Sequence, residues 1–396
     1  MSARGPRIVV LATHPIQYQA PWFRALVAEG VDLHVLFALL PDGERQATGF
    51  GGRFEWDVPL LEGYPWSALP QARATPDLGT FTGLRSVGLG RALAGLSPDV
   101  VVLTGWNSLP LVQGLRAAIQ LGIPTVVRGE SNGLGPRSAW KAAGHRALLA
   151  CYDAFIGIGR ANREFYERNG VPPDRIVDGG YFVDEEHFAA LRERESPRRT
   201  DSRKEWGVPS AACCLLFAGK LQPKKRPLDF IAALGLAARR LPSGTIHGLV
   251  VGSGELEAEA RRAAALSAAP VTFTGFLNQS EIGRAYAAAD AIVLPSDWEE
   301  TWGLVVNEAM LFGLPGIVSD RVGCGPDLVS ERETGYVVPF GDVRTLEERM
   351  VEVSLGEALR VGLGERARER VRGYSPRRGA RATIAAARIA MGEARA

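Results

Sequence analysis

Short apolar runs alternate with longer amphipathic stretches along the first half of the chain. The runs are typical of buried strands, and the stretches have the spacing of helices with one apolar face. The expected strands span residues 7–12, 32–39, 100–103, 125–128 and 154–158, and the expected helices span 21–29, 84–96, 110–121, 139–152 and 161–169. Continuous apolar strands separated by helices predict a parallel sheet that is covered on both faces.

The second half repeats this rhythm after a polar interruption. Residues 192–203 are rich in Arg, Glu and Ser without an apolar period, which predicts a solvated linker. The strands expected beyond it span 213–218, 246–251, 271–274, 291–294, 316–320 and 334–338, and the helices span 228–240, 255–266, 280–288, 301–312 and the tail from 374. The sequence therefore predicts two α/β domains, 1–195 and 205–373.

Composition supports this division and excludes several classes of protein. A chain of 396 residues is too long for a single hydrophobic core. Its contents of 46% apolar and 23% charged residues are ordinary for globular domains. The net charge of +2 does not indicate a nucleic-acid surface. No run approaches the ~18 apolar residues of a membrane span, and residues 8–12 are too short for a signal-peptide core, so we expect a cytoplasmic protein without a transmembrane segment.

Cysteine and histidine usage argues against a metal centre. The four cysteines form no C-x-x-C pair, the five histidines are scattered, and no D-x-D motif occurs. This pattern suits buried thiols in a reducing compartment better than disulfides or zinc. We expect neither a metal ion nor a cofactor.

The stretch 291–315 carries the first chemical signal. A strand, a polar turn and an all-round apolar helix precede Gly313 and Pro315, with Glu300 before the helix and Glu308 two turns inside it. The two backbones are roughly 12 Å apart along the helix axis, which suits the two ends of one elongated ligand. Glu308 should be buried and therefore paired, either with an internal cation, which would make it structural, or with ligand hydroxyls.

Two further features indicate an anion site near Glu300. The amides of Thr301, Trp302 and Gly303 at the expected helix start favour a phosphate. The loop 219–226 places Lys220, Lys225 and two further cations before a helix, where the positive end of the helix dipole repels them. A bound anion would offset this repulsion; the alternative is that the charges are merely solvated.

The pair Gly252-x-Gly254 follows a strand, as do the first two glycines of a dinucleotide-binding loop. Glu257 stands where the third glycine belongs, and the next strand ends in Gly275 in place of an acidic residue. A dinucleotide-binding oxidoreductase is therefore a weak alternative.

Three polar loops follow strands in the first half, at the edge where such sheets bind ligands. They supply His14 and Gln17, then Asn107, then Arg128 and Glu130. Turn formation, helix capping and an Arg–Glu pair that closes the sheet edge are the structural alternatives. The Gly-rich and aromatic segment 41–76, which includes Phe50, Phe54, Tyr64 and Trp66, is a candidate acceptor-binding excursion.

The run Glu300, Thr301-Trp302-Gly303, Leu304-Val305-Val306-Asn307, Glu308, Ala309-Met310, Gly313 and Pro315 resembles the E-x7-E motif of retaining GT-B glycosyltransferases of family 4. The resemblance is close over about 212–339 and covers the first half by architecture alone. It implies two facing doubly wound Rossmann-like domains with the active site in the cleft between them. It also implies that a C-terminal helix, 374–396, crosses back onto the first domain.

The resemblance also implies roles for individual residues. Glu308 would bind the ribose hydroxyls, and Glu300 the hydroxyls of the sugar ring. Lys220, Lys225 and the amides of Thr301 to Leu304 would hold the diphosphate and sugar, with Gly252 and Gly254 beside the nucleotide and Leu277 facing the base. The first domain would bind the acceptor through residues such as Gln17, Asn107 and Arg128.

The chain departs from the family pattern at three places. Lys220 replaces an arginine, and His-Pro-Ile-Gln-Tyr replaces a glycine-rich loop after the first strand. Arg128-Gly129-Glu130-Ser131 stands where the family commonly has a histidine near the reacting sugar. We therefore predict that Glu130 orients the acceptor hydroxyl, with His14 as the other candidate.

Together these features predict a retaining, metal-independent, hexosyltransferase-like enzyme that uses a nucleotide sugar and an acceptor hydroxyl. A nucleotide-sugar epimerase of the same architecture is an alternative within enzymes. An oxidoreductase or a non-catalytic sugar-binding protein is the alternative from another class.

Overall fold

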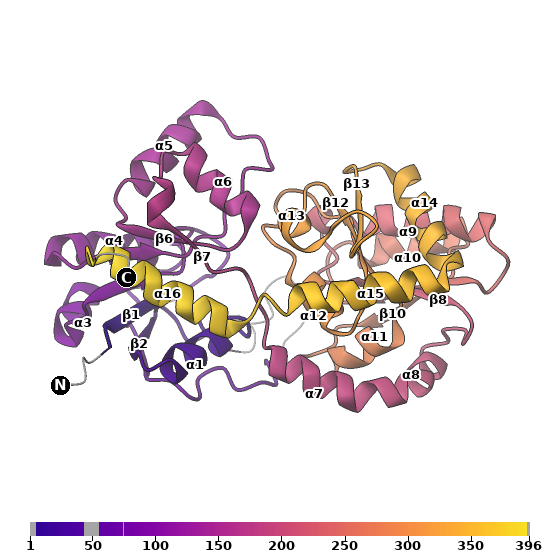
Figure 1. Ribbon diagram of the computed structural model, residues 1–396, viewed down its shortest axis with the longest axis horizontal. Helices are drawn as coiled ribbons and strands as arrows, with labels where there is room; N and C mark the ends of the chain where they lie inside the picture. The colour runs from indigo at the N-terminus through magenta and orange to yellow at the C-terminus, as the bar shows by residue number, and fades with distance from the viewer. Residues whose placement is uncertain (1–4, 43–54, 74, 394–396) are drawn as a thin grey trace. The chain divides into compact units, whose positions relative to one another are not determined.

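The computed structural model describes residues 5–42, 55–73 and 75–393, and their contacts divide them into two α/β units (Figure 1). The first unit contains the described residues up to Phe182 together with those from Tyr374 onward. The second unit runs from Val183 to Gly373. Both are built on parallel sheets, as the alternation of apolar and amphipathic segments predicts.

The sheet of the first unit has the order β3-β2-β1-β4-β5-β6-β7. Its strands are β1 (Arg7–Ala12), β2 (Asp32–Phe37), β3 (Trp66–Ala68), β4 (Val100–Leu103), β5 (Thr125–Val127), β6 (Ala154–Gly157) and β7 (Ile176–Asp178). The helices are α1 (Ala20–Ala28), α3 (Leu89–Leu96), α4 (Leu109–Leu121), α5 (Ala139–Leu149), α6 (Arg160–Arg168) and α16 (Pro376–Ala390). Alternate residues of β1 enter two different cores, Ile8 and Val10 on one face and Val9 and Leu11 on the other.

The C-terminal helix α16 belongs to the first unit. Ser375 caps it by accepting the Arg378 amide, and buried alanines such as Ala380 and Ala386 let it approach α1 and the sheet closely. The Trp22 indole donates to Thr383 Oγ1 over 3.1 Å, so this contact joins residues 361 positions apart. The last helix of the described chain therefore packs on the same unit as its first strand.

The second sheet has the order β10-β9-β8-β11-β12-β13. Its strands are β8 (Cys213–Ala218), β9 (Ile246–Val251), β10 (Val271–Gly275), β11 (Ala291–Leu294), β12 (Gly316–Ser319) and β13 (Gly335–Val338). The helices are α7 (Glu185–Glu195), α8 (Arg199–Glu205), α9 (Pro227–Arg240), α10 (Glu257–Ser267), α11 (Ile282–Ala288), α12 (Leu304–Leu311), α13 (Gly325–Leu328), α14 (Val343–Leu355) and α15 (Glu357–Val371). Among the described residues, no helix has the length and apolarity needed to cross a membrane.

The predicted linker at 192–203 is wrong. These residues form the end of α7, a short 3-10 turn and most of α8, and they belong to the second unit, so the boundary falls after Phe182 and not near residue 195. The arginines that suggested solvation have distant partners: Arg203, 4% exposed, bonds to Asp290 at 2.6 Å and to the Ala288 and Ala212 carbonyls.

Candidate functional site

The loops that follow β8, β9, β10, β11 and β12 gather at the carboxyl edge of the second sheet, because all its strands run parallel. Hydrogen bonds join three of these loops. The Asp297 amide donates to the Lys224 carbonyl over 2.9 Å, and the Gly323 amide donates to the Glu300 carbonyl over 3.1 Å. The Glu300 loop is therefore held between the lysine-rich loop and the loop after β12.

Lys225 and Glu300 form an ion pair at this edge. Their side chains are 14% and 13% exposed, so the pair is largely shielded from water while still reaching the surface. Because charges interact more strongly away from bulk water, this pair fixes the position of both groups. The sequence predicted each residue as a ligand contact but did not predict that they bind each other.

Lys220 lies half-buried in the same loop. Burial lowers the pKa of Lys220, and the neighbouring charges of Lys224 and Lys225 lower it further. A bound anion would reverse that effect by favouring the charged amine. The mutual repulsion of these lysines is the electrostatic basis for the predicted anion site, which stays a prediction.

Gly252 and Gly254 allow a close backbone contact between the loop after β9 and the lysine-rich loop. A Cβ at Gly252 would lie 2.1 Å from the Gly219 carbonyl oxygen, and one at Gly254 would lie 2.6 Å from the Leu221 carbonyl oxygen. The Leu221 amide donates to the Ser253 carbonyl over 2.9 Å. The two glycines thus allow the loop after β9 to lie directly against the lysine loop, which weakens the dinucleotide interpretation.

The start of α12 differs from the prediction. The helix begins at Leu304 and not near Thr301, because Gly303 adopts a φ of 100° that stops the helix from extending backward. The amides at the helix start therefore belong to Gly303, Leu304 and Val305 rather than to Thr301 and Trp302. The Trp302 ring is 2% exposed and donates to Asn307 Oδ1 over 2.8 Å, so this side chain is part of the core.

Gly323 and Cys324, which the sequence analysis missed, support this segment. The Cys324 amide donates to the Trp302 carbonyl over 2.9 Å, and a Cβ at Gly323 would lie 1.8 Å from the Thr301 carbonyl oxygen. Burial and the nearby Glu300 carboxylate raise the pKa of the Cys324 thiol. The signal in the sequence was a Gly-Cys-Gly run just after a strand.

Glu308 is buried, as predicted, at 2% exposure. The Tyr286 hydroxyl of α11 donates to Glu308 Oε2. The Tyr286 ring packs against Phe312 at 5.4 Å and Phe188 at 6.2 Å. Tyr286 was not predicted because it lies 22 residues before Glu308 with no local motif to mark it.

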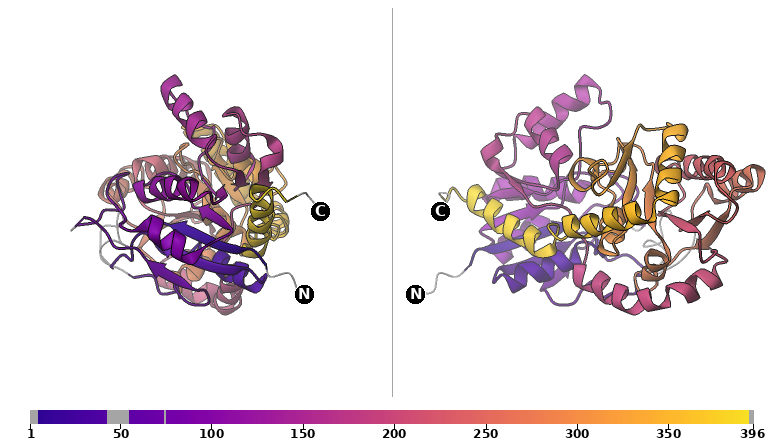
Figure 2. Two further views of the ribbon diagram at one scale, coloured as in Figure 1. Left: turned by 90° about the vertical axis from the view of Figure 1, so that its left-hand side faces the viewer. Right: turned by 45° about the vertical axis from the view of Figure 1, so that its right-hand side comes forward.

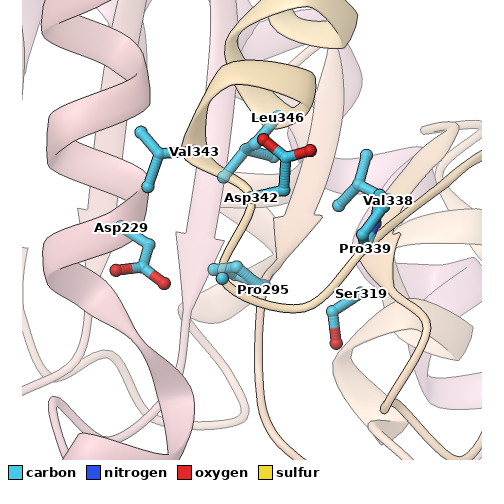
Figure 3. A pocket seen from close by; sticks show the side chains of 9 residues that line it. Asp229, Pro295, Ser319, Val338, Pro339, Asp342, Val343 and Leu346 are labelled. Carbon is cyan, nitrogen blue, oxygen red and sulfur yellow. The ribbon is translucent and has the colours of Figure 1, made fainter.

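Leu277 lies in the half-buried loop after β10, on the same carboxyl edge. A small pocket also lies along this edge, beyond β11 (Figure 3). Its lining includes Asp229 and Asp342, and both carboxylates already have structural roles, since Asp229 pairs with Arg226 at 2.8 Å and Asp342 caps α14. The pocket does not include Glu300, Lys225 or Glu308 among its lining residues.

In the first unit, Arg128 and Glu130 follow β5. Arg128 is 2% exposed, and its guanidinium carbon lies 4.5 Å from the Tyr181 ring centroid, 5.3 Å from that of Trp22 and 5.4 Å from that of Phe182. The Tyr181 hydroxyl donates to Glu130 Oε1 over 2.6 Å, and Arg128 Nη1 lies 3.8 Å from the same oxygen. Glu130 keeps 35% of its side chain exposed. A buried aromatic cage therefore orients a carboxylate that reaches the surface.

The other predicted residues of this unit lie in separate loops. His14 Nδ1 is 3.0 Å from Thr13 Oγ1, and burial lowers the pKa of His14 to about 4, so the imidazole is neutral and weakly basic near pH 7. Gln17 is half-buried and Asn107 is exposed. Ser108, next to Asn107, stands at the N-cap position of α4, as the capping alternative for this loop expects, but its side chain makes no capping hydrogen bond.

The proposed excursion at 41–76 is partly a structural segment. Tyr64 is 7% exposed and packs against Phe23 at 5.1 Å, and Trp66 begins β3. Phe50 and Phe54 lie outside the described residues. Within the described ranges, no group of three or more His, Cys, Asp or Glu residues is placed to hold a metal ion.

The fold and the carboxyl-edge site define a two-unit α/β protein of the GT-B class, and comparison with known proteins agrees. Residues 198–370 match the model of the glycosyl transferases group 1, and residues 15–177 match the glycosyl transferase 4-like domain. A GDP-mannose-dependent alpha-mannosyltransferase of Mycolicibacterium smegmatis is 30% identical over 285 residues, 69% of each chain. The chain belongs to the GT-B glycosyltransferases of family 4.

Other relatives match over shorter stretches or in fold alone. A D-inositol 3-phosphate glycosyltransferase of Saccharomonospora viridis is 33% identical over 190 residues, 46% of this chain and 43% of its own. The chain spans about half the length of this and similar curated relatives. A glycosyltransferase from Rickettsia africae shares the fold with a TM-score of 0.75 at 13% identity, covering 98% of this chain and all of its own. Anabaena HepE in complex with UDP-glucose has a TM-score of 0.68 at 16% identity, covering 96% and 98%.

Proposed function

We propose that the protein is a retaining, metal-independent glycosyltransferase that moves a sugar from a nucleoside diphosphate sugar to an acceptor hydroxyl. The observation that carries this proposal is the Lys225–Glu300 ion pair beside Lys220 at the carboxyl edge of the second sheet. The lysines lie where a diphosphate leaving group gains negative charge as the glycosidic bond breaks, and such charge stabilisation lowers the barrier. Glu300 supplies an acceptor for the hydroxyls of the sugar.

The remaining donor contacts follow from the same edge. Glu308 accepts from Tyr286 and, having two oxygens, also accepts from ribose hydroxyls. The amides of Gly303, Leu304 and Val305 bind phosphate at the start of α12, and Leu277 contacts the base. Gly252 and Gly254 act indirectly by letting the lysine loop take its shape.

The first unit would bind the acceptor. Glu130 orients the acceptor hydroxyl, while Arg128 and Tyr181 hold the carboxylate in one position. Retention without a covalent intermediate places the acceptor on the leaving-group face, and its proton passes toward the departing phosphate. Glu130 then needs only to orient the hydroxyl and stabilise charge, with Gln17 and Asn107 as further acceptor contacts.

The relatives suggest which donors to test first. The similar mycobacterial enzyme is named for GDP-mannose, and the similar Anabaena structure holds UDP-glucose. The full chain is therefore incubated with each of these donors and a panel of sugar, lipid and small-molecule acceptors. We expect acceptor-dependent release of nucleoside diphosphate that EDTA does not abolish, with the donor's anomeric configuration kept in the first product seen by proton NMR.

Each competing function has its own result in this experiment. Inversion in the first product would overturn the retaining assignment, and loss of turnover in EDTA would overturn metal independence. Conversion of the donor without any acceptor would favour an epimerase. Binding of NAD in preference to nucleoside diphosphates would favour an oxidoreductase, and tight binding without turnover a sugar-binding protein.

The role of Glu130 is tested by Glu130→Gln. This change keeps shape and hydrogen bonding but removes the charge, so kcat should fall on the order of 10² while KM for the donor stays nearly constant. Tyr181→Phe is the companion variant, because it removes one hydroxyl and leaves the ring on Arg128. It should lower kcat by about tenfold, the loss that goes with one hydrogen bond to a charged group. Normal turnover in both variants would make Glu130 a structural partner of Arg128.

A further inference from the structure

Helix α5 of the first unit exposes an apolar face. Trp140 is 72% exposed, and Ala143, Gly144 and Ala147 are exposed at positions i+3, i+4 and i+7 from it. Residues with this spacing share one side of a helix. In the three ribbon views α5 projects from the rest of its unit (Figures 1 and 2). A tryptophan is usually well buried, so its position on a projecting helix suggests an interaction surface.

The opposite side of α5 determines this orientation. Leu149 is buried, and the His145 ring packs edge-on against Phe165 at 5.4 Å and Trp106 at 6.2 Å. Burial lowers the pKa of His145, and the charges of Arg137 and Lys141 lower it further. Packing of the His145 side on the unit leaves the Trp140 side directed outward.

Cations flank the exposed side. Lys141 and Arg146 of α5 are exposed, and so is Arg137 just before the helix, whose guanidinium lies 4.7 Å from the centroid of the Phe165 ring. Residues 131–152 contain no Asp or Glu. The Lys141 ammonium lies 5.6 Å from the Trp140 ring centroid. The carboxylates of the adjacent helix α6 have their own cations, since Glu164 pairs with Arg168 at 2.7 Å and Glu167 with Arg163 at 2.9 Å. Within the described part of the chain, these two pairs occupy the α6 carboxylates, and Arg137, Lys141 and Arg146 form no ion pair with a carboxylate.

We propose that this α5 face, made of Trp140, Ala143, Gly144 and Ala147 with Arg137, Lys141 and Arg146, docks on an anionic lipid bilayer. One indole and three small residues offer little apolar area for a specific protein interface, which needs a well-packed apolar centre. Three neighbouring cations suit the diffuse negative charge of a lipid surface, and tryptophan prefers the headgroup level. The three cations together contribute roughly a hundredfold to the partition coefficient.

The test is co-sedimentation of the full chain with phosphatidylcholine vesicles that do or do not contain phosphatidylglycerol, without donor or acceptor. We expect binding to the anionic vesicles that weakens as salt rises. Reversing the three charges, Arg137→Glu, Lys141→Glu and Arg146→Glu, should lower the partition coefficient by more than about a hundredfold, since it removes three attractions and adds three repulsions. Trp140→Ser should lower it by about tenfold, because the indole no longer enters the headgroup layer.

The matched control reverses three exposed arginines of the second unit, Arg198→Glu, Arg239→Glu and Arg262→Glu, so the net charge changes equally. Its binding should stay within about twofold of the wild type, because cations away from the membrane are screened. Equal losses in both triple variants, equal binding to neutral vesicles, or no binding by the wild type would each overturn the proposal. A mass by light scattering that is dimeric in the wild type and monomeric in Trp140→Ser, without vesicle binding, would overturn it in favour of a second copy of this chain.

Discussion

Replacing Lys225 with methionine should lower kcat/KM for the sugar nucleotide by on the order of 10² to 10³, the loss typical of removing one group that stabilises charge in the transition state. The physical reason is the position of the ammonium, which is largely shielded from water and held beside Glu300. In the proposed reaction the diphosphate gains charge as the sugar leaves, and Lys225→Met removes one of the cations proposed to stabilise that charge. Affinity for the bare nucleoside should hardly change, because the nucleoside has no diphosphate.

The neighbouring lysine is a matched control for this variant. Lys224→Met removes the same charge from the same loop, yet Lys224 contacts the Glu300 loop through its backbone carbonyl, which the substitution keeps. We expect its kcat/KM to fall by less than about tenfold, as for a partly exposed charge in high dielectric. Steady-state kinetics and nucleoside titration measure both effects, with thermal melting to confirm folding. Two results would contradict the proposed role of Lys225: an equal fall in kcat/KM in the two variants, or an equal fall in affinity for nucleoside and for sugar nucleotide. Either result would mean that Lys225 acts only through the overall charge of the loop.

Replacing Arg203 with methionine should lower the free energy of unfolding by about 3–5 kcal/mol, the cost of breaking a buried charged network by removing one partner. The guanidinium bonds to Asp290 at 2.6 Å and to the carbonyls of Ala288, Ser210 and Ala212. Methionine fills a similar volume but leaves these buried oxygens without their donor. The loss follows mainly from desolvated acceptors and not from the lost ion pair itself.

Arg198→Met is the control for Arg203→Met. Arg198 is exposed in the turn between α7 and α8, so its substitution should change the free energy of unfolding by less than about 0.5 kcal/mol. Urea unfolding followed by far-UV circular dichroism measures both variants. A similar urea midpoint for Arg203→Met and the wild type would show that Asp290 is adequately held by Arg199, which lies 2.7 Å from it.

The strands were the most predictable part of the fold. β1, β4, β8, β9 and β11 have the bounds that the apolar runs indicate, because a strand buried on both faces must be apolar throughout. The short edge strands β3 and β7 were missed, since neither contains a continuous apolar run. The helices α14 and α15 were missed because charged residues interrupt their apolar spacing.

The linker error has a different cause. A run of Arg, Glu and Ser has the same composition whether it is solvated or helical, and the difference depends on distant partners. Arg203 and Arg199 bind Asp290, which lies about ninety residues further along the chain. Local sequence does not encode such a pairing, so the charged run was predicted as a surface segment.

The candidate site was predictable in its members but not in its contacts. The carboxylates Glu300 and Glu308 and the lysines were identified by type and spacing, and the structure brings Lys225 and Glu300 together. The partner of Glu308 on α11 and the cage around Arg128 depend on which helices and strands become neighbours. The start of α12 depends on the positive φ of Gly303, and the sequence alone does not show which glycines adopt a positive φ.

The close backbone contacts at Gly252 and Gly323 bear on how the protein tolerates genetic variation. Every codon change that removes glycine adds at least a Cβ, and here that atom would meet a carbonyl oxygen at 2.1 Å or 1.8 Å. In a saturation-mutagenesis library selected for activity, we therefore expect both positions to tolerate as few substitutions as Glu300, the carboxylate proposed to bind the donor sugar. Expression level should separate the two groups: variants at the glycines should lose folded protein, whereas variants at Glu300 should lose activity with a smaller loss of folded protein.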